Sequence, residues 1–214
     1  MKIIVAITAA SGSIYARQVV DLLVADDAVS RVALIYSRSA REVCRHEGVR
    51  VAEHHPKVVV MDNCDMFASV ASGSAHWDAM VVVPCSVGTL ARVASGISDT
   101  LITRAADVML KERRRLVMVV REMPLSLVHL RNMCAVTEAG GVILPASPSM
   151  YGAECSSVEQ LTQTVSRRAV ELAGASRCVV EWSGVTSAPM VDSPMVDPPM
   201  VDPPMVDPQG NREI

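Results

Sequence analysis

Short apolar runs rich in Val, Ile and Leu alternate along the first 175 residues with segments whose apolar positions recur every three or four residues. The runs predict buried strands at residues 3–7, 31–36, 58–61, 79–83, 116–120 and 142–144. The intervening segments predict helices at residues 13–26, 39–47, 89–95, 101–111, 125–139 and 158–172. Because strands that alternate with helices form parallel sheets covered on both faces, the pattern predicts a three-layer α/β fold, Rossmann-like (flavodoxin-like), with a central parallel sheet.

Local signals refine this pattern at three places. Ser39 and Glu42 have the spacing of a capping box at the start of the second helix. Pro84 is expected to end the fourth strand. From Pro189 the unit Pro-Met-Val-Asp plus one residue occurs four times, and proline at this density disfavours helices and sheet ladders. We therefore expect a domain at residues 1–175 and a tail outside the fold at residues 176–214. The alternative is that Met and Val side chains of the tail dock on a neighbouring subunit.

Composition narrows the class of protein. Half of the residues are hydrophobic but only six are aromatic, so the core must be aliphatic, as parallel sheets usually are. A net charge of −3 gives no general attraction to nucleic acid or anionic membranes, and no apolar stretch approaches the ~20 residues that span a bilayer. The six cysteines form no CxxC pair, which argues against a structural zinc site and predicts reduced thiols in a cytoplasmic protein.

Three predicted turns place hydroxyl groups and helix starts at the carboxyl edge of the sheet, where ligands of such folds bind. They are Thr8–Ser13, Tyr36–Ser39 and Pro84–Thr89. A tight turn or a simple helix N-cap could explain each of them alone. Together they favour a phosphorylated ligand such as a mononucleotide, held by backbone N–H groups at helix N-termini.

A second group of candidate residues surrounds the strand at 116–120. The basic run Lys111–Arg115 precedes it, at a helix C-terminus where cations are favoured by the helix dipole. Arg121 and Glu122 follow it at the carboxyl edge, where an Arg suits phosphate binding and a Glu suits proton transfer. The segment 145–151 after the last predicted strand is unremarkable on its own.

Several segments occur in the order and spacing of one known family. They are VAITAASGSIYA, IYSRSARE, ASGS, VVPCSVGTL, ISDTLITRAADVMLKERRRLV, VVREMPLSLVHLRNM and GGVILPASPSMY. Over residues 1–174 the chain resembles flavin prenyltransferases of the UbiX type. The resemblance implies an enzyme that transfers a dimethylallyl group from dimethylallyl monophosphate to N5 and C6 of reduced FMN without a metal. It also implies a homododecamer with active sites at subunit junctions, and prenylated FMN as a product that serves UbiD-type decarboxylases.

The resemblance also implies roles for individual residues. The residues that it implies bind FMN are Ala9, Ala10, Ser11, Ser37, Ser86, Val87, Gly88, Thr89 and Arg121. Those that it implies hold the prenyl phosphate are Arg104, Lys111, Tyr151 and Arg168, and a metal-free site needs such donors to stabilise the leaving phosphate. Ser11, Glu47 and Glu122 are the implied catalytic residues. The chain departs from the family at Ala9 and Ala16, where Gly is common, at Met66, near a frequent Trp, and at Arg115, which replaces Pro.

Two alternative functions stay open. A flavin-dependent cysteine decarboxylase has a related fold, but those enzymes use a Pro-Ala-Ser-Ala-Asn-Thr loop, and the loop VPCSVGTL at this position has no Asn. The other alternative is an FMN-binding carrier or partner subunit of a decarboxylase without prenyl transfer. Binding and catalysis share most residues in this family, and a pure carrier would not need Lys111 or Glu122.

Overall fold

A computed structural model describes residues 1–150 and 157–175 of the chain. The predicted tail at 176–214 and the predicted site residue Tyr151 lie outside these ranges. In the described part of the chain, no helix is both long and apolar enough to cross a membrane.

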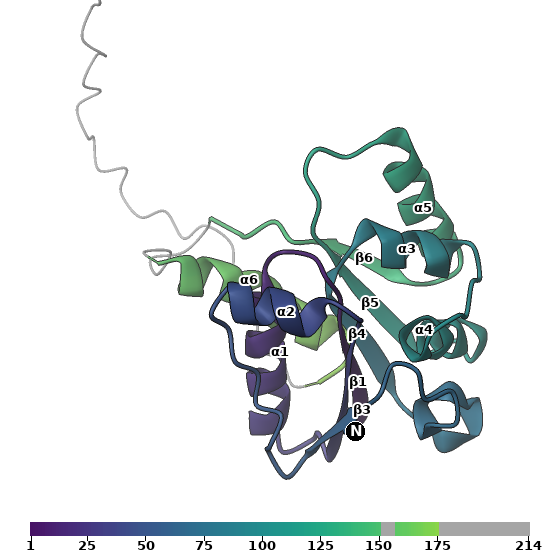
Figure 1. Ribbon diagram of the computed structural model, residues 1–214, viewed down its shortest axis with the longest axis horizontal. Helices are drawn as coiled ribbons and strands as arrows, with labels where there is room; N and C mark the ends of the chain where they lie inside the picture. The colour runs from purple at the N-terminus through teal and green to yellow at the C-terminus, as the bar shows by residue number, and fades with distance from the viewer. Residues whose placement is uncertain (151–156, 176–214) are drawn as a thin grey trace, which may run out of the picture. The chain divides into compact units, whose positions relative to one another are not determined.

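Six strands form one parallel sheet in the order β3-β2-β1-β4-β5-β6 (Figure 1). Their bounds are β1 Lys2–Ile7, β2 Arg31–Tyr36, β3 Val58–Met61, β4 Ala79–Cys85, β5 Arg115–Val120 and β6 Val142–Pro145. This is the strand order of a Rossmann fold, in which the chain reverses its direction across the sheet between β1 and β4. The loops that follow β1 and β4 therefore diverge and leave a crevice at the carboxyl edge.

Helices cover both faces of the sheet. Their bounds are α1 Ser13–Ala25, α2 Ala40–His46, α3 Val87–Ala94, α4 Leu101–Lys111, α5 Leu127–Glu138 and α6 Val158–Leu172. Alternate residues of β1 enter two separate cores: Ile3, Val5 and Ile7 pack with residues of α1, α2 and α6, whereas Ile4 and Ala6 pack with residues of α3, α4 and α5. Figure 1 shows these two layers on either side of the sheet. The predicted three-layer parallel α/β fold is confirmed.

Buried polar contacts join α1 to α6. The Gln18 side-chain amide donates to the Thr162 hydroxyl at 3.0 Å, and the Ser166 hydroxyl donates to Gln18 Oε1 at 2.8 Å. All three residues are buried, so their polar groups satisfy one another inside the interface between the helices. These contacts fix α6 on the face of the sheet that carries α1.

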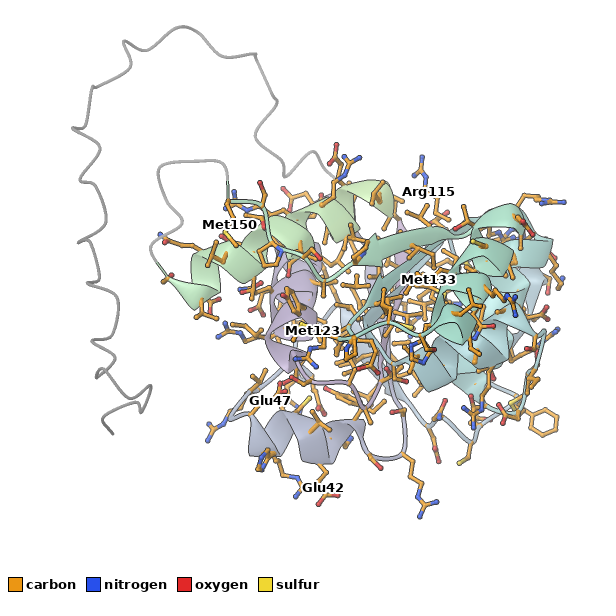
Figure 2. All side chains as sticks on the ribbon, turned by 90° about the horizontal axis from the view of Figure 1, so that it is seen from above. Glu42, Glu47, Arg115, Met123, Met133 and Met150 are labelled. Carbon is orange, nitrogen blue, oxygen red and sulfur yellow. The ribbon has the colours of Figure 1, made fainter. Side chains whose placement is uncertain are left out.

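The predicted capping box of α2 is wrong. Ser39 precedes the helix, but its side chain makes no capping hydrogen bond. Its backbone (φ −106°, ψ 2°) is not in the extended conformation from which an N-cap side chain reaches the helix N–H groups. The Ala40 N–H donates to the Ser37 carbonyl, so the chain is already turning before the helix begins. Figure 2 shows Glu42 on the outer side of α2, away from α1.

Pro84 does not end β4, because the strand continues to Cys85. The pairing of β4 with β5 shifts register between Val82 and Cys85, which accommodates a residue with no N–H to donate. Two 3-10 turns, η1 (Ser69–Ala71) and η2 (Gly73–Ala75), were also not expected. They lie in a segment that has no apolar periodicity.

Candidate functional site

The turns that follow β2, β1 and β4 are fastened to one another at the carboxyl edge. The Thr8 hydroxyl donates to the Pro84 carbonyl at 2.7 Å and accepts the Ser86 N–H at 2.8 Å. On the other side of β1, the Ser37 N–H donates to the Ile7 carbonyl at 2.8 Å. The three turns predicted to form one site are therefore neighbours in the structure. They border the crevice between β1 and β4.

The ends of β5 and β6 extend this edge. The Arg121 N–H donates to the Cys85 carbonyl at 3.1 Å, and the Ala146 N–H donates to the Val120 carbonyl at 2.9 Å. Arg121 therefore follows directly on the same row of strand ends as Ser86. These main-chain contacts join the carboxyl ends of five neighbouring strands, β2, β1, β4, β5 and β6, into one continuous rim.

The carboxylate of Glu47, the residue after α2, binds the N–H groups at the start of α1. Glu47 accepts the backbone N–H groups of Gly12 at 2.8 Å and Ser13 at 2.7 Å, and it also accepts the Ser13 hydroxyl. Figure 2 shows Glu47 on the side of α2 that faces α1. Partial burial tends to raise the pKa of Glu47, but hydrogen bonds from Ser13, Gly12 and Ser11 outweigh it, and the pKa falls below its usual value.

This arrangement changes the interpretation of the first predicted phosphate turn. The N–H groups at the start of α1 were expected to face a bound anion, but two of them already bind the protein's own carboxylate. The Ser13 hydroxyl, which was expected to be free for a ligand, is buried and also bound to Glu47. The structure brings Ser11 and Glu47 together, as two implied catalytic residues should be.

The loop Ser86–Thr89 begins α3. The Ser86 side chain accepts the Thr89 N–H at 3.3 Å, so N-capping, the simpler explanation for this serine, applies. The backbone N–H groups of the first helical turn have no partner within the helix and can face an anion. A Cβ on Gly88 would meet only the Arg92 side chain, at 3.5 Å, so the space beside this turn is open to a ligand.

A pocket of about 540 Å³ opens beside this rim, within the size range of small-molecule sites. Its lining residues come from α1, the ends of β5 and β6, the loop after β5, and α5: Tyr15, Val120, Arg121, Glu122, Met123, Pro124, Leu125, Met133, Pro145, Ala146 and Ser147. Figure 2 labels two of these lining residues, Met123 in the loop after β5 and Met133 on α5. The predicted residues Arg121 and Glu122 thus share one pocket, and the segment at 145–151 contributes its first three residues.

Tyr15 is a pocket residue that the sequence did not single out. Its hydroxyl lies 3.5 Å from the Ala146 carbonyl, and its ring lies against Gly12, whose φ of +98° is accessible mainly to glycine. Burial raises the pKa of Tyr15, and the positive charge of Arg121 opposes that rise. Only its position one turn into α1 could have suggested this role.

Lys111, one of the implied phosphate-binding cations, lies at the opposite edge of the sheet. Helix α4 leads into the start of β5, so Lys111 lies at the amino edge, about 20 Å from the carboxyl edge across a six-residue strand. Arg104 donates from Nε to the Ala71 carbonyl at 3.1 Å and pairs with Asp107 at 2.7 Å. Arg104 is in the first turn of α4, which starts beside Asn63, just after β3. One chain does not bring Lys111 to its own crevice.

Arg168 is also separate from the pocket in the part of the chain that the structure describes. It is exposed on α6 and pairs with Glu171 at 2.6 Å. Arg115, one of the departures from the family pattern, donates to the Ala173 carbonyl at 3.5 Å and so packs against the end of α6.

Comparisons with known proteins agree on one group. A family model described as Flavoprotein matches residues 1–170. A flavin prenyltransferase UbiX of Thermoplasma acidophilum is 40% identical over 183 residues, which cover 85% of this chain and 99% of that protein. The crystal structure of AnUbiX (PadA1) in complex with FMN and dimethylallyl pyrophosphate is 42% identical with a TM-score of 0.74, covering 80% of this chain and 91% of that one.

Two further solved structures resemble the chain at different levels of sequence identity. A dodecameric FMN-dependent UbiX-like decarboxylase from Escherichia coli O157:H7 has a TM-score of 0.79 at 34% identity, covering 86% of this chain and all of that one. The FMN-dependent cysteine decarboxylase TvaF from thioviridamide biosynthesis is only 19% identical, with a TM-score of 0.56 over 81% of this chain and 98% of that one. The second likeness shows a shared fold alone.

Proposed function

The chain belongs to the flavoprotein family, among the flavin prenyltransferases of the UbiX type, and from this membership we propose that it transfers a dimethylallyl group to reduced FMN. The product is prenylated FMN, alkylated at N5 and C6, and the proposed donor is dimethylallyl monophosphate. The observation that carries the proposal is the crevice between β1 and β4, whose rim holds the implied FMN residues of three separate turns. We assign the activity to residues 1–175.

We propose that FMN lies along this rim. The open first turn of α3 offers N–H groups to its phosphate, while Ser37 and Arg121 border the crevice on either side. Ala9, Ala10 and Ser11 line the turn after β1, where small side chains let a flavin approach the backbone. Since Glu47 already binds the start of α1, the FMN phosphate should bind at the turns after β2 and β4 instead.

Reduced flavin would supply the nucleophile: N5 would bond to the allylic carbon and lose its proton, while the C–O bond breaks with its electrons on the phosphate. For ring closure the prenyl double bond would take up a proton, its tertiary carbon would bond to C6, and C6 would then lose its proton, so no oxidant is needed. The protein must therefore stabilise a leaving phosphate and accept a proton. The lowered pKa of Glu47 keeps it ionised at neutral pH, which suits a proton acceptor better than a donor. Glu122 lines the pocket and is the candidate for protonating the phosphate, and Ser11 would orient the reacting groups.

The leaving phosphate needs cations that one chain cannot supply to its own crevice. Lys111 lies at the amino edge, so we propose that a neighbouring subunit brings it, together with Arg104 of the same helix, to the donor phosphate. Tyr151 and Arg168 are the remaining proposed donors to that phosphate. A homo-oligomer, specifically a dodecamer like the Escherichia coli relative, provides such junctions. We further propose a UbiD-type decarboxylase as the recipient of the product, and the cytoplasm as the compartment, because all cysteines in the described ranges are free thiols.

The test is an anaerobic incubation of the full chain with reduced FMN and either dimethylallyl monophosphate or the pyrophosphate. We expect the flavin mass to increase by one dimethylallyl group with the monophosphate. An unchanged flavin mass, under conditions in which a known flavin prenyltransferase forms the adduct, would leave an FMN-binding carrier as the function. An adduct with the pyrophosphate alone would keep the activity and correct the donor.

A further inference from the structure

The Ala-Ser-Gly-Ser stretch at residues 71–74 is part of the family pattern, yet the proposed chemistry gives it no role. It includes the end of η1, which packs against α4, and the start of η2. The carbonyl of Ala71 accepts Arg104 Nε at 3.1 Å, and the carbonyl of Gly73 accepts Arg114 Nη2 at 2.8 Å. The backbone of the stretch thus contacts an arginine in the first turn of α4 and another just after its end.

Gly73 has the closest of these contacts. An added Cβ at this position would lie 2.3 Å from Glu112 Oε1 and 2.5 Å from Glu112 Cδ, both well inside van der Waals contact. The φ of Gly73 is not in the left-handed region, so the glycine is required for space rather than for backbone conformation. Gly73 is buried, and the carboxyl group of Glu112 lies directly against its Cα.

Glu112 in turn binds Lys111. The Lys111 ammonium donates to Glu112 Oε1, and Arg114 approaches Glu112 Oε2 at 3.8 Å. A lysine side chain has many rotamers, and a fixed partner reduces the entropy that it loses when it binds a phosphate. The position of the Lys111 ammonium therefore depends on Glu112, and the position of Glu112 depends on the missing side chain of Gly73.

We propose that Gly73 and Glu112 are positioning residues of the prenyl-donor site: the bare Cα of Gly73 gives Glu112 the place from which it orients Lys111. This inference rests on the proposed function, because it takes Lys111 to bind the donor phosphate. It predicts a defect in donor binding that does not extend to FMN, whose crevice lies at the other edge of the sheet.

The experiment uses Gly73→Ala in the full-length oligomer. The atoms in the way belong to the end of a partly exposed side chain, so the protein should fold, with Glu112 displaced and Lys111 released. We expect KM for dimethylallyl monophosphate to rise about tenfold, the effect of losing one charge-assisted hydrogen bond. Because Lys111 also acts in the proposed transition state, kcat/KM should fall by at least as much, whereas the Kd for FMN should change less than about twofold.

A second variant separates positioning from general damage. Gly73→Ala combined with Glu112→Asp shortens the carboxylate by one methylene, which makes room for the new Cβ and keeps a partner for Lys111. It should return KM to within about threefold of wild type. Ser74→Ala, a substitution in the same stretch, is the control that should leave KM unchanged.

The outcomes distinguish this inference from the proposed function. A wild type that forms no flavin adduct would contradict the proposed function itself. If the wild type is active, an unchanged KM in Gly73→Ala would overturn the positioning role. So would a defect that Glu112→Asp does not repair, or one that weakens FMN binding equally.

Discussion

Glu47 and Glu112 are two ionised carboxylates at opposite edges of the same sheet, and they are held by different kinds of partner. Neutral donors surround Glu47, namely two backbone N–H groups and the Ser13 hydroxyl. Glu112 is held by the Lys111 ammonium, with Arg114 nearby. The pKa of each group is lowered, that of Glu47 by hydrogen bonds that overcome partial burial and that of Glu112 by the hydrogen bond and charge of Lys111.

The difference shows how the two edges divide the proposed reaction. Because its partners are neutral, Glu47 keeps its negative charge in the crevice and remains available as a base. At the other edge the positive charges of Lys111, Arg113 and Arg114 outnumber the carboxylate of Glu112, which suits a departing phosphate. On this proposed division, an active site requires the crevice of one chain and the cations of another.

The largest effect should come from mixing subunits. Glu122→Gln and Lys111→Ala should each lose about 10²–10⁴-fold in prenylation rate when assembled alone, since each removes a group that acts in the transition state. Co-assembled one to one, they should recover about a quarter of wild-type activity, because half of the crevices and half of the cation clusters are intact and pair at random. Flavin mass spectrometry on oligomers purified through two different tags measures the recovery.

The control for this experiment mixes Glu122→Gln with Glu47→Gln. Both substitutions damage the crevice of their own chain, so no mixture contains an intact crevice, and activity should stay at the level of the single variants. Recovery in this control, or no recovery with Lys111→Ala, would contradict the division between the edges.

A smaller effect is expected for Arg121→Ala. Its backbone lies on the rim and its side chain lines the pocket beside Tyr15, so the substitution should remove a charge-assisted contact to FMN. The Kd for FMN should increase about 10–100-fold. Fluorescence titration of FMN measures it, with Arg131→Ala, an exposed arginine of α5 outside the pocket lining, as the matched control. Equal effects of the two substitutions would place the flavin elsewhere.

The contributions of Glu47 and Glu112 to the free energy of unfolding should depend differently on pH and on salt. The pKa of Glu47 is lower in the folded chain, so its contribution is complete above the ordinary Glu pKa of about 4.3 and is lost as pH falls through the lowered value. At pH 7, Glu47→Gln should reduce the free energy of unfolding by about 1 kcal/mol, as loss of a helix N-cap does. The difference in stability between the wild type and the variant should disappear once the pH falls below that lowered pKa.

Added salt should weaken only the stabilising contribution of Glu112, at the amino edge. Glu112→Gln should destabilise less than Glu47→Gln, and its effect should disappear in about 1 M NaCl because the ion pair with Lys111 is exposed. The cost of Glu47→Gln should persist there, since its partners carry no charge. Urea unfolding in low and high salt measures both, and an equal salt dependence of the two variants would contradict the contrast.

The smallest effect is expected for Tyr15→Phe. The hydroxyl is 3.5 Å from the Ala146 carbonyl, at the limit of a hydrogen bond, whereas the ring packs against Gly12. FMN binding should change less than about threefold in Tyr15→Phe and much more in Tyr15→Ala, which leaves a hole beneath the turn after β1. A strong loss of flavin affinity in Tyr15→Phe would instead give the hydroxyl a direct role.

The fold could be predicted from the sequence because buried parallel strands are apolar on both faces. The run at Arg31–Tyr36 and the helix at Leu101–Lys111 were predicted to the residue. Strand β4 was predicted too short because proline is read as a stop, whereas here a register shift accommodates its missing N–H and the Thr8 hydroxyl donates to its carbonyl. The N-cap Ser39 was misread because a short turn precedes α2 and changes its backbone conformation.

The candidate site could be predicted only as far as strand ends locate it. Ser37, Ser86 and Arg121 each follow a strand, and parallel strands bring their carboxyl ends together. The contact of Glu47 with the start of α1 joins residues 34 or 35 positions apart and has no local signature. The separation of Lys111 from the crevice depends on which edge a helix ends at, and the family pattern alone does not show it.

The carboxylate of Glu47 at the start of α1 has a consequence for turnover. An enzyme whose product is a cofactor for another protein must release that product after each cycle. In dinucleotide-binding Rossmann folds, the N-terminus of the first helix grips the ligand's phosphates and favours long residence. Here the chain's own Glu47 carboxylate accepts two of those N–H groups, so a bound flavin would have fewer backbone contacts, and we expect it to dissociate faster.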